Sequence, residues 1–196
     1  MKVFNEPSYN EWASIIARPV IDAAQLNEKV NTIITEVVVG GDDAIKKLTL
    51  QFDGISIHEL EVSAEKIATA ENLVTAGLKT AIQLAKVNIE IFHNSQIQKV
   101  ERIETMPGVW CWRKSVGIEK VGIYIPGGSA PLFSTVLMLG VPAKMAGCKE
   151  IILCTPPNEQ GDIHPAILYA ASLVGVTAIY SVGGAQAIAA MAYGTT

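Results

Sequence analysis

Apolar residues recur at three- and four-residue spacing in the first third of the chain, a pattern typical of amphipathic helices. One such pattern occupies residues 26–37 and stops at the pair Gly40-Gly41, where a helix can end. Asp42 can then cap a second helix that continues to Phe52. The first third of the chain is therefore predicted to hold two consecutive helices separated by a glycine break.

The pattern changes after Phe52-Asp53-Gly54. Residues 55–62 alternate between apolar and polar, which favours a short strand, and Ser63 can cap the helix that follows. A longer apolar stripe occupies residues 78–92 at helical spacing and ends near Asn94-Ser95. We expect this stripe to pack in the core.

Residues 98–120 have the pattern of a β-hairpin. Pro107-Gly108 marks a tight turn, and the tryptophans that follow it favour a pleated surface that is at least half buried. Trp110 and Trp112 lie two residues apart, so they share one side of a strand. This side is expected to pack in a core or a subunit interface, and contact with a ligand is the alternative.

From Val116 onward, strands and helices alternate. Strands are expected at residues 121–125, 150–154 and 178–182, and helices at 132–146, 164–174 and 185–193. This alternation predicts an α/β fold with a Rossmann-like parallel sheet and crossover helices on both faces. We divide the chain into residues 1–115, a helical region with the hairpin, and residues 116–196, the Rossmann-like region. No strand follows the last helix, so we expect an incomplete sheet and the front part of a longer protein.

Composition narrows the range of functions. The chain has 196 residues, and 49% of them are hydrophobic. Its net charge is −4, with acidic and basic residues mixed along the chain, so the charge pattern does not indicate binding to nucleic acid or to an anionic membrane. The start lacks a signal-peptide pattern, and the most apolar stretch, residues 132–141, is too short to span a bilayer. Three cysteines without a Cys-x-x-Cys pair indicate reduced thiols. We expect a cytoplasmic protein with a small-molecule partner.

Two glycine turns follow predicted strands, at Gly127-Gly128-Ser129 and at Gly183-Gly184. Ligands of open α/β sheets bind at the carboxyl ends of the strands, and each turn leads into a helix whose first N–H groups suit an anion. Neither turn has the G-x-G-x-x-G spacing, so turn geometry alone is the alternative. If the turns hold a nucleotide, we expect Tyr124 and Gln186 to flank it.

Other residues with suitable chemistry are weaker candidates. Ser134 and Thr135 begin a predicted helix near the first turn and could contact a phosphate, although an N-cap explains them as well. Cys154 ends a strand and could act as a thiolate nucleophile, but no base lies beside it in the sequence, so we expect a buried thiol. The three histidines are scattered without metal-ligand spacing, and we expect local capping or surface roles for them: His58, His93 and His164.

Four blocks of the sequence occur in the order and at the spacing of one enzyme family. They are residues 122–131 (GIYIPGGSAP), 142–147 (PAKMAG), 155–157 (TPP) and 182–190 (VGGAQAIAA). These blocks closely resemble histidinol dehydrogenase, and weaker matches at residues 52–54 and 107–109 extend the likeness over nearly the whole chain. The likeness covers only the first half of the family's length.

The resemblance implies a specific chemistry. The family is a zinc-dependent homodimer with an aldehyde-dehydrogenase-like fold that oxidises L-histidinol through the aldehyde to L-histidine with two NAD molecules, the last step of histidine biosynthesis. Tyr124 and Gln186 match the family's NAD-binding tyrosine and glutamine. A third NAD contact, the zinc ligands and the catalytic glutamate and histidine are expected beyond Thr196. The resemblance thus implies a truncated chain without a catalytic residue or a metal site, inactive alone.

Two alternatives stay open beside this interpretation. One is a related dehydrogenase that oxidises another polar alcohol. The other is a non-catalytic binding or dimerisation module with the same fold.

Overall fold

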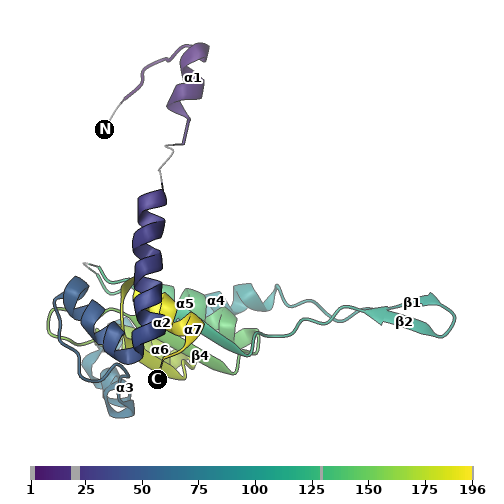
Figure 1. The fold of residues 1–196 in the computed structure, drawn as a ribbon. Coiled ribbons are helices and arrows are strands. Elements are labelled where there is room, and N and C mark those ends of the chain that lie inside the picture. Colours follow the sequence, from purple (N-terminus) through teal and green to yellow (C-terminus); the bar gives the residue numbers. More distant parts are fainter. Residues whose placement is uncertain (1–2, 19–22, 129, 196) are drawn as a thin grey trace.

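The computed structural model of this chain describes residues 3–18, 23–128 and 130–195. Figure 1 shows a body of helices and strands from which a β-hairpin projects to one side. In chain order the elements are α1 Tyr9–Ile15, α2 Ala24–Asp53, α3 Ala64–Ala70, the 3-10 turn Glu71–Leu73, α4 Ala76–Asn94, β1 Arg102–Met106, β2 Val109–Trp112, β3 Lys120–Tyr124, α5 Phe133–Met145, β4 Glu150–Thr155, α6 Pro165–Val174, β5 Ala178–Ser181 and α7 Gly184–Tyr193.

The centre of the body is a parallel sheet in the order β3-β4-β5. Tyr124 pairs with Cys154, and Cys154 pairs with Tyr180, so the three strands end at nearly the same level. This confirms the predicted α/β fold with a parallel sheet. Because the carboxyl ends are level, the loops that follow β3, β4 and β5 meet at one edge of the sheet.

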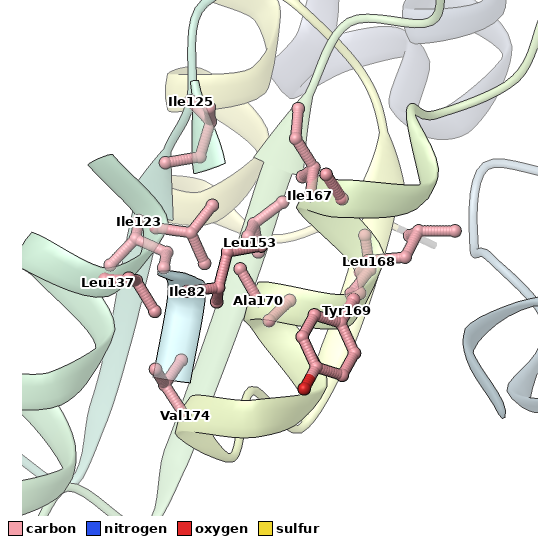
Figure 2. Packing of buried hydrophobic residues seen from close by; sticks show 14 of the residues in the cluster. Ile82, Ile123, Ile125, Leu137, Leu153, Ile167, Leu168, Tyr169, Ala170 and Val174 are labelled. Carbon is pink, nitrogen blue, oxygen red and sulfur yellow. The ribbon is translucent and has the colours of Figure 1, made fainter. Parts of the chain in front are cut away.

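Helices cover both faces of the sheet, but the prediction of crossover helices on both faces is wrong. The two crossover helices, α5 and α6, lie on the same face, because the strand order β3-β4-β5 moves in one direction and crossovers of one hand then fall on one side. On one face, α4, α5 and α6 enclose a cluster that includes Ile82, Leu137 and Leu153 (Figure 2). On the other face, the second part of α2 packs against α7 around a smaller cluster that includes Ile45 and Cys154. Consecutive residues of β4 face opposite clusters, since side chains alternate along a strand.

The two helices predicted before Gly54 form the continuous element α2, with a break inside it. Gly41 has φ 52° and ψ −137°, a conformation outside the helical region that glycine adopts without a Cβ clash. The predicted glycine break is therefore confirmed, one residue before Asp42.

The strand predicted at residues 55–62 is wrong. This segment is extended, but it makes only one isolated bridge, from Glu61 to Tyr180, at the free edge of β5. The Val62 N–H donates to the Ile179 carbonyl at 2.8 Å, and the Ser181 N–H donates to the Leu60 carbonyl at 2.7 Å. The earlier residues of the segment meet no strand, so no ladder forms. The predicted cap is confirmed, because Ser63 Oγ accepts from the Lys66 N–H at 3.3 Å.

The hairpin is confirmed at β1 and β2, but its tryptophans do not pack in the core of the described chain, and their packing in a subunit interface stays a prediction. Trp110 and Trp112 are 52% and 53% exposed, because the hairpin projects away from the body (Figure 1). The Arg102 guanidinium lies 5.2 Å from the centre of a Trp112 ring and is a cation–π neighbour within the hairpin itself.

Candidate functional site

The two glycine turns lie close together at the carboxyl edge of the sheet, with Pro156 between them. A Cβ placed on Gly127 would lie 2.8 Å from Pro156 Cγ, and one on Gly183 would lie 2.6 Å from Pro156 Cβ. Both distances are shorter than van der Waals contact, so the loops after β3 and β5 can approach the loop after β4 only without side chains. The predicted meeting of the turns is confirmed, and Pro156 is the residue that the sequence reasoning did not single out.

A hydrogen bond from α7 to β3 links the two turns. The Gly184 N–H donates to the Tyr124 hydroxyl at 3.0 Å. Gly183, the residue before α7, has no side chain to cap the helix, so Tyr124 supplies an oxygen in its place. One of the N–H groups expected to be free for an anion is therefore already bonded.

Gln186 lies in the first turn of α7 and is only 1% exposed. Neither its amide nitrogen nor its amide oxygen has a hydrogen-bond partner among the described residues. Its amide lies against Gly184, whose φ of 62° turns the backbone into the left-handed region. A buried amide without partners is costly and can be satisfied by a polar ligand that reaches it.

The other turn leads into α5. Leu132 precedes this helix and provides no side-chain cap, but its carbonyl accepts from the Thr135 N–H at 3.1 Å. The N–H groups of Phe133 and Ser134 are the ones left available to an anion. Gly128 and Ser134 are both exposed at this end. Ser129 lies outside the described residues.

A pocket of about 180 Å³ borders the first turn, with Gly127, Gly128 and Pro156 in its wall. Its described lining contains no lysine or arginine and includes Asp162, whose carboxylate forms a 2.7 Å ion pair with Lys66. An anion in this pocket would be bound by backbone N–H groups and by the polar side chains of Thr155, Asn158 and His164, which also line it.

Cys154 is buried, as expected. Burial raises the pKa of its thiol to about 11, so the thiolate is scarce near neutral pH. The structure offers no support for a nucleophilic role of this residue.

The histidines take local roles or lie at the surface. His164 caps α6, since its Nδ1 accepts from the Ala166 N–H at 3.1 Å. His93 Nδ1 lies 2.8 Å from Gln96 Oε1 at the end of α4, and His58 is exposed. Within the described residues, no group of three or more histidine, cysteine, aspartate or glutamate side chains could hold a metal ion. Over the same part of the chain, no helix is long and apolar enough to cross a membrane.

Known proteins resemble the chain over its whole length. The family model for histidinol dehydrogenase matches residues 16–196. Over 195 residues, the chain is 56% identical to a histidinol dehydrogenase of Bacteroides thetaiotaomicron and 53% identical to one of Bacteroides fragilis; each match covers 100% of this chain and 46% of the relative. The crystal structure of histidinol dehydrogenase from Elizabethkingia anophelis matches with a TM-score of 0.90 and 51% identity, over 96% of this chain and 44% of that one. The chain thus spans about half the length of the curated relatives it matches.

Proposed function

Because the chain belongs to the histidinol dehydrogenase family, we propose that it forms the NAD-binding half of an enzyme that oxidises L-histidinol to L-histidine. The observation that carries this proposal is the unpartnered amide of Gln186, buried in the first turn of α7 at the carboxyl edge of the sheet. The family assignment supports NAD as the ligand, and the geometry of this edge supports it as the proposed binding place.

The residues at this edge fit a dinucleotide. A Cβ on Gly128 would meet nothing within 4 Å, so the first turn leaves open space in which a phosphate could approach the backbone closely. The Gln186 amide can donate to and accept from a polar group of the cofactor. The Tyr124 hydroxyl, which accepts from the Gly184 N–H, would keep the start of α7 beside β3. The half-buried ring of Tyr124 would border the ligand. NAD, when bound, would accept the hydride removed from the substrate alcohol.

The described residues do not fit zinc, since they hold no group of side chains that could bind a metal ion. We therefore assign no ligand of zinc and no catalytic proton transfer to these residues. The proposal places the zinc site and the catalytic pair of the whole protein outside this chain. It also includes two properties that the family implies, a homodimer and a cytoplasmic location.

A chimera tests this proposal. Residues 1–196 of this chain would replace the matching part of the Bacteroides thetaiotaomicron relative, and NADH formation from L-histidinol would be measured with zinc and NAD. We expect an active chimera, because the chain is 56% identical to the part it replaces. A folded chimera that binds zinc but forms no NADH would refute the proposal.

A matched pair of substitutions locates the cofactor site. Gln186→Met in the chimera removes the amide and keeps its approximate volume, and we expect a raised KM for NAD. Thr49→Val is the control, because Thr49 is also buried with an unpartnered hydroxyl but lies in α2, outside the two glycine turns. Equal effects of the two substitutions on the KM for NAD would argue against a role of Gln186 in binding.

A further inference from the structure

Thr155 is the last residue of β4, and its hydroxyl has no hydrogen-bond partner among the described residues. The residue is only 2% exposed and lies in the wall of the pocket of about 180 Å³ beside Gly128. The next two residues, Pro156 and Pro157, have no N–H to offer to a ligand. The Thr155 hydroxyl is therefore a donor that β4 presents at the carboxyl edge of the sheet.

The N-terminus of α6 presents a side chain to the same pocket in place of backbone N–H groups. His164 lines the pocket and precedes Pro165, which has no N–H. The next two N–H groups are occupied, because Ala166 donates to His164 Nδ1 at 3.1 Å and Ile167 donates to the His164 carbonyl at 2.9 Å. Since Nδ1 is the acceptor in its bond, the hydrogen of the neutral ring is on Nε2. Nε2 has no partner among the described residues, so its N–H is available to a ligand.

The start of α5 completes the set of donors. Leu132, the residue before this helix, lines the pocket together with Gly128. The N–H groups of Phe133 and Ser134 are available there, and the dipole of the helix favours negative charge at this end. The pocket thus gathers a hydroxyl, an imidazole N–H and a helix N-terminus, which suits the oxygens of a phosphate.

One acidic side chain also lines the pocket, but its charge is already paired. Asp162 Oδ1 lies 2.7 Å from Lys66 Nζ, which comes from α3. Asn158 holds the same loop, because its Oδ1 accepts from the N–H groups of Gln160 and Asp162 at 3.0 and 2.9 Å. The described lining therefore offers an anion several free donors and no unpaired carboxylate.

These donors and the Gln186 amide lie on opposite faces of the sheet. Side chains alternate along a strand, so Thr155 shares the face of Leu153, which α5 and α6 cover. Gln186 belongs to α7, which packs on the other face with Cys154. Pro156 lies between the two glycine turns at the edge. A ligand that reaches both sets of groups must cross this edge, as an extended dinucleotide can.

We infer that the Thr155 hydroxyl and the His164 Nε2–H bind the diphosphate of the dinucleotide, in the pocket at the starts of α5 and α6. This inference rests on the proposed function and adds to it two residues and the chemical group that they bind. Phosphate oxygens are charged acceptors, and hydrogen bonds to charged acceptors are stronger than those between neutral groups. The cofactor would lie across the edge of the sheet, with its diphosphate on the side of α5 and α6 and another polar group at Gln186.

NAD binding to the zinc-loaded chimera, measured by calorimetry without histidinol, tests the inference. Thr155→Val removes the hydroxyl and keeps the shape of the side chain, and His164→Ser removes the ring but keeps an oxygen that can cap α6. We expect each variant to weaken NAD binding about tenfold. Thr49→Val and His93→Ser are the matched controls, since neither residue lines the pocket, and both should leave the affinity unchanged.

Phosphorus NMR of bound NAD distinguishes contact with the diphosphate from contact with the rest of the cofactor. We expect Thr155→Val and His164→Ser to shift the phosphorus resonances of bound NAD relative to the parent chimera. Gln186→Met should leave these resonances unchanged, because its amide would bind another part of the cofactor.

Four results would overturn the inference. NAD binding that is weakened by Gln186→Met but unchanged in both pocket variants would do so and leave the proposed function standing. Phosphorus resonances that are the same in the parent and the pocket variants would mean that Thr155 and His164 contact another part of the cofactor. Inorganic phosphate that binds in the pocket without displacing NAD would identify a site for the free ion. A folded chimera that does not bind NAD would refute the proposed function and the inference with it.

Discussion

The strongest prediction concerns the stability of the chain after Gln186→Met. Gln186 is 1% exposed, and both polar atoms of its amide lack partners among the described residues. Leaving a buried polar group unsatisfied costs about 1–3 kcal/mol. Methionine has a similar length and no strong polar group, and swaps that conserve volume usually cost less than about 1.5 kcal/mol.

Removal of the unsatisfied amide should increase the stability, whereas the change of side-chain shape should decrease it. The first effect is the larger. We expect Gln186→Met to raise the free energy of unfolding by about 1 kcal/mol, which corresponds to a rise in Tm of roughly 2–4 °C for a chain of this size. The same substitution removes a hydrogen-bonding group from the proposed NAD site, which should weaken NAD binding by about three- to tenfold.

The assay is urea unfolding without NAD, followed by circular dichroism, together with NAD titration of the chimera. Thr49→Val should also increase the stability, because it removes another unpartnered buried oxygen, but it should leave NAD binding unchanged. A Gln186→Met variant that is less stable than the parent chain would refute the reasoning, since it would mean that the amide is well hydrogen-bonded in solution.

Three further predictions concern the turns and the buried thiol. Gly183→Ala should destabilise the chain by about 1–3 kcal/mol in urea unfolding, because its Cβ would lie 2.6 Å from Pro156, whereas Gly128→Ala meets nothing within 4 Å and should be nearly neutral. Tyr124→Phe should cost about 0.5–1.5 kcal/mol in the same assay, since the Gly184 N–H loses its acceptor; an unchanged stability would mean that water replaces the hydroxyl. Burial raises the pKa of Cys154 from 9.0 to about 11, so the protonated thiol favours the folded state. The free energy of unfolding should therefore fall as the pH rises from about 9 to about 11, by up to roughly 2–3 kcal/mol, and Cys154→Ala should reduce that slope.

Local patterns predicted most of the Rossmann-like region. Alternating apolar runs and glycine turns placed β3, β4 and β5 within one or two residues, because these signals depend on neighbours in the chain. The glycine break in α2 and the Ser63 cap were predicted for the same reason.

Predictions that depended on distant contacts succeeded less well. Residues 55–62 have a strand-like pattern, but whether they form a strand depends on a partner, and only the edge of β5 near Tyr180 is within reach. The tryptophans of the hairpin were expected to be half buried, yet nothing in the described part of the chain covers them. Pattern and propensity indicate which surfaces are apolar, and only the packing shows which of them are buried.

Some features of the candidate site could likewise be predicted from the sequence, and others could not. The meeting of the two glycine turns followed from the order of strands and turns, because parallel strands bring their carboxyl ends to one edge. The role of Pro156 could have been inferred from its position directly after β4, between the two turns in the sheet order. The bond from Gly184 to Tyr124 could not, since it depends on how far α7 approaches β3.

Burial of an unpartnered polar group does not by itself identify a binding site, and Thr49 shows why. Its hydroxyl is as deeply buried as the Gln186 amide and also lacks a described partner, yet it lies in α2 rather than at the carboxyl edge of the sheet. A single hydroxyl also loses less by burial than an amide with two donors and two acceptor positions. Gln186 differs because its amide lies in the first turn of a helix that begins at a glycine turn, where the field of the helix favours negative charge. The position of the unpartnered Gln186 amide, more than its burial, indicates a ligand.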